Sequence, residues 1–355
     1  MAPPHRQPPA RPRPRPARRR WMWAAVVPVV VLALGGGLLW LRLESNISVA
    51  DVDAALGGDR PARGPDGSLN ILILGSDSRS GKNAEYGEDT GSARSDTAML
   101  VHLPTGRHAA TVISIPRDTM VHRPACPLPG GGTAREADPV MFNSVYATGG
   151  APCAVKTVEE LGRIRVDHVV DVDFTGFRKL VDALGGVTVT TDRAIHDTYS
   201  HLDLPAGTHH LDGERALGLV RTRHGIGDGG DLGRIGLQQK FMAALAGQLH
   251  DSGLLRNPVR LYRIADTATS ALTTDKALAS VRALADLAGS LGGLEPSEIV
   301  FRTLPVTTYP PDPNRLAVRH PEAEALFTAI REDTPLPATP APEAPAPEPE
   351  GGHRP

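Results

Sequence analysis

Cysteine is scarce in this chain of 355 residues, which contains only Cys126 and Cys153. Two cysteines exclude a disulfide-dense scaffold and a zinc site with four cysteine ligands. Acidic residues are missing from residues 1–42, which hold eight of the 38 basic side chains. The rest of the chain therefore carries 30 basic and 40 acidic side chains, a net charge of −10. This balance excludes a strongly basic body that binds bulk DNA.

Long apolar runs are also few, and the one that stands out covers residues 21–41, uncharged between Arg20 and Arg42. As a helix, its 21 residues would span about 31 Å, which matches a bilayer core of about 30 Å. Arginines crowd its N-terminal side, which places the N-terminus in the cytoplasm and the following chain outside the cell. The alternative is a cleaved signal peptide, with residues 48–50 as cleavage site, but the length of the run favours a retained single-pass anchor in the cell membrane.

Composition divides the chain into five parts. They are a disordered Arg/Pro-rich tail (1–20), a transmembrane helix (21–41), a polar linker with a short helix near 49–56 (42–68), one extracellular domain (69–332) and a disordered Pro/Ala/Glu-rich tail (333–355). Outside the cell, Cys126 and Cys153 meet an oxidising environment and can form a disulfide bond. Two unpaired buried thiols are the alternative.

Three apolar runs predict the first strands of the domain, at 69–75, 97–103 and 109–115. A five-residue connection joins the second and third runs, which predicts an antiparallel hairpin. The segment between the first and second runs, 76–96, lacks helical periodicity, so we expect a long loop between antiparallel neighbours.

This topology gathers charged residues at one edge of the sheet, where strands end or begin. They are Asp77, Arg79, Arg94, Asp96, Arg117 and Asp118. A group of charges is usually a solvated surface. However, strand ends are also where α/β sheets commonly bind their ligands.

The second half of the domain adds a strand, a helix and a strand at 165–190, with Asp173 as the predicted N-cap of the helix. Further on, Arg221 and Arg223 are two positions apart, so in an extended segment both would point to one side. After a glycine-rich loop, Arg234 and Gln238 begin an amphipathic helix. Paired arginines, glycines and a helix start suit a phosphate or pyrophosphate. The alternative is that the two arginines pair with local acids.

These segments, in this order, resemble the LytR-CpsA-Psr family of cell-wall glycopolymer ligases, in its actinobacterial form. The resemblance covers the motifs ILGSDSR (73–79), ARSDTAML (93–100), SIPRDT (114–119), FNSVYATGG (142–150), VDFTGFRKLVDALGGV (172–187), LDGERALGLVRTRH (211–224) and GDLGRIGLQQKF (230–241). It implies an α-β-α domain whose central mixed, largely antiparallel sheet is flanked by helices. It also implies a phosphotransferase that moves a glycopolymer from a polyprenyl-pyrophosphate carrier to a peptidoglycan hydroxyl, with the lipid tail in an apolar tunnel.

The resemblance also implies roles for individual residues. Asp77 and Asp96 would hold Mg²⁺, or Mn²⁺ in its place, which suits a metal bound by carboxylates and substrate phosphates. The pyrophosphate would be bound by Arg94, Arg117, Arg221 and Arg223, with Arg79, Asp231, Arg234 and Gln238 in support. Arg94, Asp96, Arg117 and Asp118 would be catalytic, Asp118 or an arginine being a candidate base. The chain departs from the family at Leu237, before the glutamine pair, and in its glycine-expanded loop.

Two other functions compete with the ligase. The same site could hydrolyse a polyprenyl pyrophosphate with water as the acceptor, since both reactions need the same charges and metal. The second competing function is non-enzymatic: a membrane-bound protein that binds or regulates components of wall assembly. Nothing in the sequence resembles a helix-turn-helix, so we expect lipid, glycan and peptidoglycan as partners and no nucleic acid.

Overall fold

The computed structural model describes residues 34–76, 95–223, 231–251 and 257–338. Within these ranges, no helix is both long enough and apolar enough to cross a membrane. Most of the predicted span 21–41 lies outside them, and so do Asp77, Arg79 and Arg94. A helix is described from residue 34 to residue 46, past the predicted end of the span.

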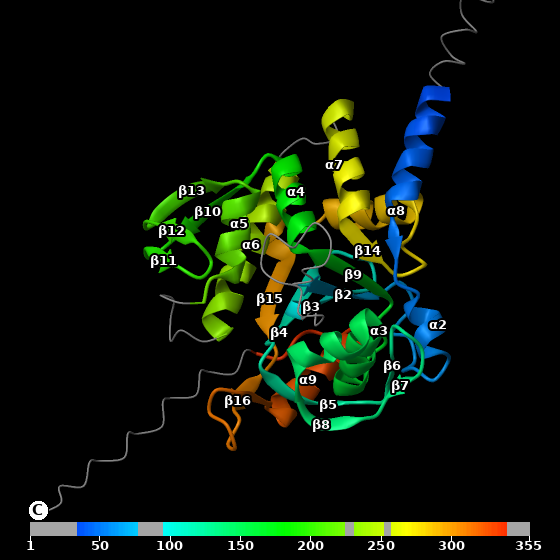
Figure 1. The fold of residues 1–355 in the computed structure, drawn as a ribbon, viewed down its shortest axis with the longest axis vertical. Coiled ribbons are helices and arrows are strands. Elements are labelled where there is room, and N and C mark those ends of the chain that lie inside the picture. Colours follow the sequence, from blue (N-terminus) through cyan, green and yellow to red (C-terminus); the bar gives the residue numbers. More distant parts are fainter. Residues whose placement is uncertain (1–33, 77–94, 224–230, 252–256, 339–355) are drawn as a thin grey trace, which may run out of the picture.

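A seven-stranded sheet forms the centre of the molecule, in the order β1-β14-β9-β2-β3-β4-β15 (Figure 1). Its strands are β1 (Ser48–Val49), β2 (Leu69–Ser76), β3 (Ser95–Leu103), β4 (Ala110–Ile115), β9 (His168–Asp173), β14 (Leu272–Thr274) and β15 (Ile299–Thr303). The three predicted strands are thus β2, β3 and β4, and both predicted antiparallel pairings are confirmed.

The prediction of a largely antiparallel sheet is wrong, because β9 lies parallel to β2, β15 parallel to β4 and β14 parallel to β1. Parallel neighbours require a long crossover connection, and helices provide it here. The chain between β2 and β9 includes α3, and the chain between β4 and β15 includes α6 to α8. The sheet is therefore mixed, as predicted, with parallel and antiparallel pairs in equal number.

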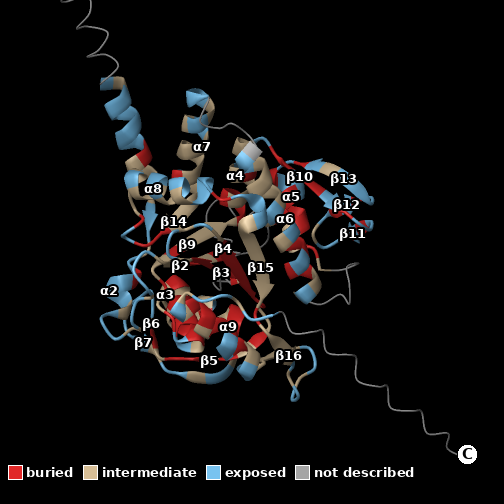
Figure 2. Cartoon of the chain, turned by 180° about the vertical axis from the view of Figure 1, so that it is seen from behind, coloured by how far each residue is buried: buried red, intermediate tan, exposed pale blue. Residues whose placement is uncertain are grey.

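Helices cover both faces of this sheet. The helices are α2 (Val52–Leu56), α3 (Phe142–Gly162), α4 (Phe174–Leu184), α5 (Gly213–Arg221), α6 (Asp231–Asp251), α7 (Pro258–Ala271), α8 (Val281–Gly292) and α9 (His320–Glu332), with a short 3-10 turn at Pro296–Glu298. Alternate residues of β2 face opposite sides. Leu72 and Leu74 pack with α3 and α9, whereas Ile71 lies in a cluster with Met242 of α6 and Leu287 of α8. Figure 2 shows the buried strands between these layers.

Four smaller sheets surround this core. They contain β5 (Thr119–Arg123), β8 (Ala137–Met141), β16 (Val306–Thr308) and β17 (Leu316–Val318); β6 (Cys126–Pro127) and β7 (Thr133–Ala134); β10 (Val187–Thr191) and β13 (Gly207–Leu211); and β11 (Ile195–Asp197) and β12 (Leu202–Leu204). Cys126 of β6 and Cys153 of α3 form a disulfide bond, with their Cα atoms 5.2 Å apart. This confirms the disulfide that the sequence allowed and joins the β6–β7 hairpin to the helix layer.

The helix predicted after Asp173 is confirmed as α4. The Asp173 side chain accepts a hydrogen bond from the backbone N–H of Gly176, and Gly185 ends the helix in the left-handed conformation. The prediction that Arg221 and Arg223 share one side of an extended segment is wrong. Arg221 is the last residue of α5, which Asp212 caps by accepting from the Arg215 N–H. Arg221 is therefore helical, and of the two arginines only Arg223 lies in the chain after the end of α5.

Candidate active site

Two arginines from distant parts of the chain meet at Asp96, the second residue of β3. Nη1 of Arg117 donates a hydrogen bond to Oδ1 of Asp96 at 2.8 Å, and Nη2 of Arg223 donates to the same oxygen at 3.3 Å. Arg117 follows β4, which is antiparallel to β3, so the hairpin returns it to the start of β3. The sheet topology therefore builds the contact predicted at this edge.

The first turn of α6 completes the cluster. Nη2 of Arg234 donates to the backbone carbonyl of Asp96 at 2.8 Å and faces Oδ1 of Asp231 at 2.5 Å. The carboxylate of Asp231 accepts from the backbone N–H of Arg117 at 3.0 Å. A carboxylate at the first position of a helix is stabilised by the helix dipole. Asp231 and Arg234 therefore fix the backbone on both sides of the Asp96–Arg117 contact.

Burial and crowding shift the pKa values in this cluster. Burial alone would raise the pKa of Asp96, but the charges of Arg234, Arg223 and Arg117 outweigh it and hold that pKa below its ordinary value. Burial, together with the charge of Arg234, lowers the pKa of Arg223 to about 10. Burial raises the pKa of Asp231 and lowers that of Arg234. Both arginines stay protonated at neutral pH, so their guanidinium groups can interact with an anion.

Two residues that the sequence did not suggest hold these groups in place. Asp197, at the end of β11, is buried and accepts from the backbone N–H of Arg223 at 2.9 Å. Thr97 accepts from the Nε2 of Gln238 at 3.0 Å, and the same nitrogen donates to the Val220 carbonyl. Gln238 therefore ties α6 to β3 and α5. In the sequence, Asp197 is only an aspartate before a turn. Such a pattern does not indicate which distant segment the side chain will bind.

The structure thus brings together most of the predicted residues that it describes. Those in one cluster are Asp96, Arg117, Asp118, Arg223, Asp231, Arg234 and Gln238. Arg221 lies with its guanidinium 4.6 Å from the ring centroid of Phe174. Phe174 follows Asp173, which pairs with Ser76 at the end of β2. Arg221 therefore lies toward the point where the chain enters residues 77–94, which are outside the described residues together with the glycine-rich loop at 224–230.

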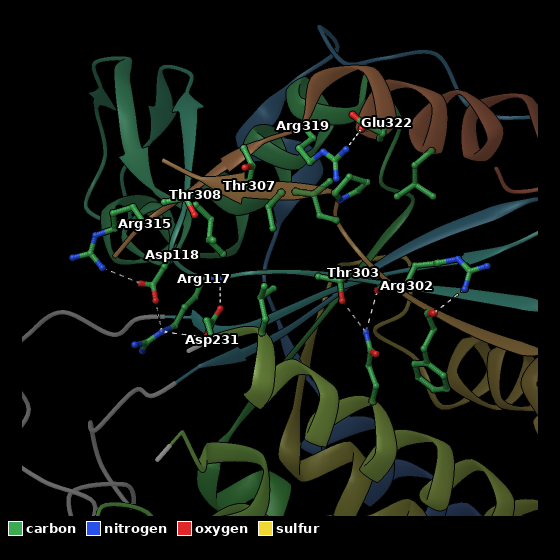
Figure 3. Close-up of a pocket in the computed structure, with 18 of the residues that line it drawn as sticks. Arg117, Asp118, Asp231, Arg302, Thr303, Thr307, Thr308, Arg315, Arg319 and Glu322 are labelled. Atoms are coloured by element: carbon green, nitrogen blue, oxygen red, sulfur yellow. Dashed lines mark hydrogen bonds and ion pairs between the residues drawn. The ribbon is translucent and has the colours of Figure 1, made fainter. Parts of the chain in front are cut away.

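A cavity of about 1560 Å³ opens beside this cluster (Figure 3). At one end it is lined by Arg117, Asp118 and Asp231, whose ion pairs Figure 3 marks. From there the cavity continues along the strands β15, β16 and β17 to the start of α9. Its charged and hydroxyl-bearing lining residues in this part are Arg302, Thr303, Thr307, Thr308, Arg315, Arg319 and Glu322. Five arginines and three acids line the whole cavity. Its excess of positive charge and its hydroxyl groups suit an anionic, hydroxylated ligand much larger than a pyrophosphate.

The residues present fit a divalent metal ion only in part. Oδ1 of Asp96 already accepts from Arg117 and Arg223, which leaves Oδ2 as the atom through which Asp96 would reach a metal. The second predicted ligand, Asp77, is outside the described residues. In the part of the chain that the structure describes, no group of three or more His, Cys, Asp or Glu side chains could hold a metal ion. A metal with one or two carboxylates and substrate phosphates remains compatible with this arrangement.

A buried acid lies on β9, two positions before Asp173. The Tyr146 hydroxyl donates a hydrogen bond to Asp171. Burial raises the pKa of Asp171 to about 6, and the nearby charge of Asp173 adds to the effect. Tyr146 belongs to α3, so this hydrogen bond joins β9 to that helix.

The family model described as the LytR_cpsA_psr family matches residues 40–332 of the chain. Among sequence relatives, the cell wall biosynthesis protein LcpA of Corynebacterium glutamicum is 33% identical over 80% of this chain and 59% of its own length. The polyisoprenyl-teichoic acid–peptidoglycan teichoic acid transferase TagT of Bacillus subtilis is 38% identical over 56% of this chain and 61% of its own. The chain thus spans about three fifths of the length of these curated relatives.

Solved structures show the same fold. A LytR-Csp2A-Psr enzyme from Actinomyces oris matches 81% of this chain and 96% of its own, with a TM-score of 0.62 at 23% identity. A structure of TagT bound to LI-WTA matches 80% of this chain and 97% of its own, with a TM-score of 0.57 at 25% identity. The mixed sheet with helices on both faces is therefore shared with these proteins.

Proposed function

The chain belongs to the LytR_cpsA_psr family, and on this premise we propose that it is a membrane-anchored phosphotransferase of the cell surface. Its donor is a glycopolymer carried on a polyprenyl pyrophosphate, and its acceptor is a peptidoglycan hydroxyl. The names of its relatives support this, since TagT is described as a transferase of polyisoprenyl-linked teichoic acid to peptidoglycan. The observation that carries the proposal is the meeting of Arg117 and Arg223 at Asp96 beside the large cavity.

The arginines bind the pyrophosphate of the donor in this proposal. Guanidinium groups match phosphate oxygens in pairs and remain charged at neutral pH. Nε of Arg234 is buried and makes no hydrogen bond within the described structure, and Nε of Arg117 makes only longer ion pairs, at 3.5 Å to Asp118 and 3.6 Å to Asp231. Donors left without a partner at a buried site are costly unless a ligand satisfies them. Arg94, Arg79 and Arg221 would add to this binding from the side of residues 77–94.

The chemical step replaces a phosphoanhydride bond by a phosphodiester bond. The acceptor hydroxyl oxygen attacks the phosphorus that bears the glycan, and the bond from that phosphorus to the bridging oxygen breaks. The lipid monophosphate leaves with the bond's electrons, and the hydroxyl proton passes to a base, for which Asp118 is positioned between Arg117 and Arg315. Arg117, Arg223 and Arg234 neutralise the charge that develops on the leaving phosphate.

In this proposal, Asp96 and Asp77 would hold a divalent metal ion, Mg²⁺ or Mn²⁺, together with the phosphates of the substrate. When bound, it would supply further neutralisation of the pyrophosphate. The glycan portions of donor and acceptor would occupy the cavity between β15 to β17 and α9, because its hydroxyl groups and arginines can bind sugar hydroxyls and anionic groups.

A transfer assay tests the proposal. The full-length protein in detergent is mixed with a polyprenyl-pyrophosphate-linked glycan and a peptidoglycan oligomer, and products are identified by mass spectrometry. We expect a phosphodiester-linked conjugate and free lipid monophosphate, and loss of both with Arg223→Ala. The matched control is Arg282→Ala. This arginine of α8 is exposed and pairs only along its own helix, with Asp286, among the ion pairs of the described structure. A phosphorylated glycan released without acceptor attachment would assign hydrolysis instead, and binding without turnover would assign the non-enzymatic role.

A further inference from the structure

Two helices run side by side on one side of the molecule, the helix at 34–46 and α7 (Figure 1). Each leads into a short strand, and these strands, β1 and β14, pair in parallel. The Arg42 Nε donates to Asp266 Oδ1 at 3.1 Å, and Asn46 donates to the same oxygen. The carboxylate of Glu44 accepts from the backbone N–H of Val281, the first residue of α8. The last turns of helix 34–46 are therefore fixed to the domain.

The Arg42–Asp266 ion pair sets the two helices level with one another. From this pair, helix 34–46 continues eight residues toward its N-terminus, to Leu34, and α7 also continues eight residues, to Pro258. At about 1.5 Å per residue, both helices extend about 12 Å beyond the ion pair. In Figure 1 both helices point the same way, away from the sheet. The first turn of α7 therefore reaches as far as Leu34 does.

Apolar side chains lie beyond the ion pair on both helices, and on helix 34–46 the basic side chain lies at the pair. On helix 34–46, Leu38 is 69% exposed and Trp40 is 49% exposed. At the start of α7, Val259 is 68% exposed and Leu261, two residues nearer the ion pair, is 39% exposed. Arg260 lies between them in the sequence and donates to the Leu184 carbonyl at 2.8 Å. The side chain of Arg42 is largely exposed at the level of the pair. Apolar groups with a tryptophan and then arginines are the order in which side chains meet a bilayer and its headgroups.

The chain that precedes Leu34 decides which surface this end of the molecule meets. Residues 21–33 continue the uncharged apolar run of the sequence, so the described helix begins within the predicted membrane anchor. We propose that the N-terminal turn of α7, through Val259 and Leu261, inserts into the outer leaflet of the membrane beside helix 34–46. This inference rests on the membrane anchorage in the proposed function. Val259 lies seven residues beyond the ion pair, about 10 Å, which matches the depth of about 5–10 Å at which interfacial helices bury apolar side chains.

A second contact changes what the anchor does. A single helix leaves the domain free to tilt on the membrane, whereas insertion of α7 beside it fixes the orientation. In Figure 1 the arrow of β15 points away from the N-terminal end of α7. The cavity begins at the C-terminal ends of β4 and β15, so this orientation holds it on the side away from the bilayer. A lipid-borne donor must then extend from the membrane to the site, which favours long polyprenyl chains over short ones.

Site-specific labelling tests this insertion. Because both native cysteines are in the disulfide, a single introduced cysteine can be labelled with the fluorophore NBD in the full-length protein. The three positions are Leu38→Cys, Val259→Cys and Glu324→Cys, the last on the distant helix α9. The proteins are reconstituted into vesicles of phosphatidylcholine and phosphatidylglycerol, and the label is quenched by doxyl-labelled lipid or by aqueous iodide.

We expect blue-shifted emission and loss of most of the fluorescence with doxyl lipid at positions 38 and 259, and iodide quenching alone at 324. Iodide quenching at 259 with lipid quenching at 38 would overturn the insertion while the anchor stands. Iodide quenching at both positions would overturn the anchorage as well. Protection of position 259 from both quenchers would show that a second protein copy covers α7, which would also overturn the proposal. Unchanged melting temperatures of the three variants verify that labelling leaves the fold intact.

Discussion

Two groups of buried charges in this molecule satisfy their hydrogen bonds in opposite ways. Arg60, between α2 and α3, donates to both carboxylate oxygens of Glu159, at 2.7 and 2.9 Å, and to the Val166 carbonyl at 2.8 Å. Burial would lower the pKa of Arg60, but Glu159 and then Asp53 outweigh it, and the pKa is raised. At the candidate active site the pKa of Arg223 is lowered to about 10, and Nε of Arg117 makes no hydrogen bond within the described structure, only ion pairs of 3.5 and 3.6 Å to Asp118 and Asp231.

The difference shows how a structural ion pair can be told from a ligand site. A structural pair commits its donors to a fixed partner, as Arg60 does, because a buried charge without a partner is destabilising. The site instead has Nε donors that make no hydrogen bond within the described structure, beside a cavity lined by more arginines than acids, which suits an anion. The first group should therefore matter for folding and the second for binding and turnover.

Arg60→Ala is the change with the largest expected effect, and it acts on stability. It leaves Glu159, whose side chain is 3% exposed, without its cation, which typically costs about 3–5 kcal/mol. We expect the free energy of unfolding in urea to fall by that amount, while the transfer rate per folded molecule stays unchanged. Arg165→Ala, which removes a longer ion pair to Asp53, is the milder control. A transfer rate that fell in proportion to the stability would remove the distinction between the two groups.

Arg117→Ala should show the converse. Loss of one donor to a developing oxyanion typically lowers kcat by about 10²–10³-fold. Stability should change much less than in Arg60→Ala, because Arg223 and Arg234 still neutralise Asp96. Steady-state transfer kinetics and urea unfolding of the same preparation check both parts. A large fall in stability with normal turnover would place Arg117 among the structural charges.

Asp171 extends the comparison to a buried acid that accepts from Tyr146 and lies near the like charge of Asp173. Its pKa of about 6 in the folded protein exceeds the unfolded value, so the folded state binds more protons between these values. Stability should therefore fall as pH rises through this window, by about 2–3 kcal/mol at most. Asp171→Asn cannot titrate, so its stability relative to the wild type should increase between about pH 4 and pH 7. Urea unfolding at several pH values measures this, and a constant difference would contradict it.

Arg315→Ala should have the smallest effect. Its guanidinium is half-buried at the cavity wall and lies 3.5 Å from Asp118. The pair is long and Arg315 is still reached by water, so we expect it to contribute about 0–1 kcal/mol to stability. We expect an almost unchanged melting temperature and a several-fold rise in KM for a glycan substrate, on the order of the 1 kcal/mol that one such hydrogen bond contributes. An unchanged KM for both donor and acceptor would show that this part of the cavity does not hold glycan.

The sequence predicted the parts of the fold whose signals are local. The continuous apolar runs identified β2, β3 and β4, and the short connection between two of them indicated the hairpin. Asp173 located the start of α4 to the residue, because caps depend on the chain within a few positions. Segment 211–223 was harder, because its helix depends on Asp212 as a cap and on burial of the residues that follow, and Arg221 was placed wrongly as a result.

By itself, the sequence determined that Asp96, Arg117 and Asp118 would meet at one edge of a sheet, because antiparallel strands of known polarity leave no other arrangement for their ends. It also allowed only one disulfide pairing, since the chain has only two cysteines, and the structure shows that this bond forms. Tertiary structure alone decided that Asp197 holds Arg223 and that Thr97 holds Gln238, because these contacts join segments more than 20 positions apart. It also decided the parallel pairings of β9 and β15 and the cavity beside β15, which depend on how whole helices pack and not on any local pattern.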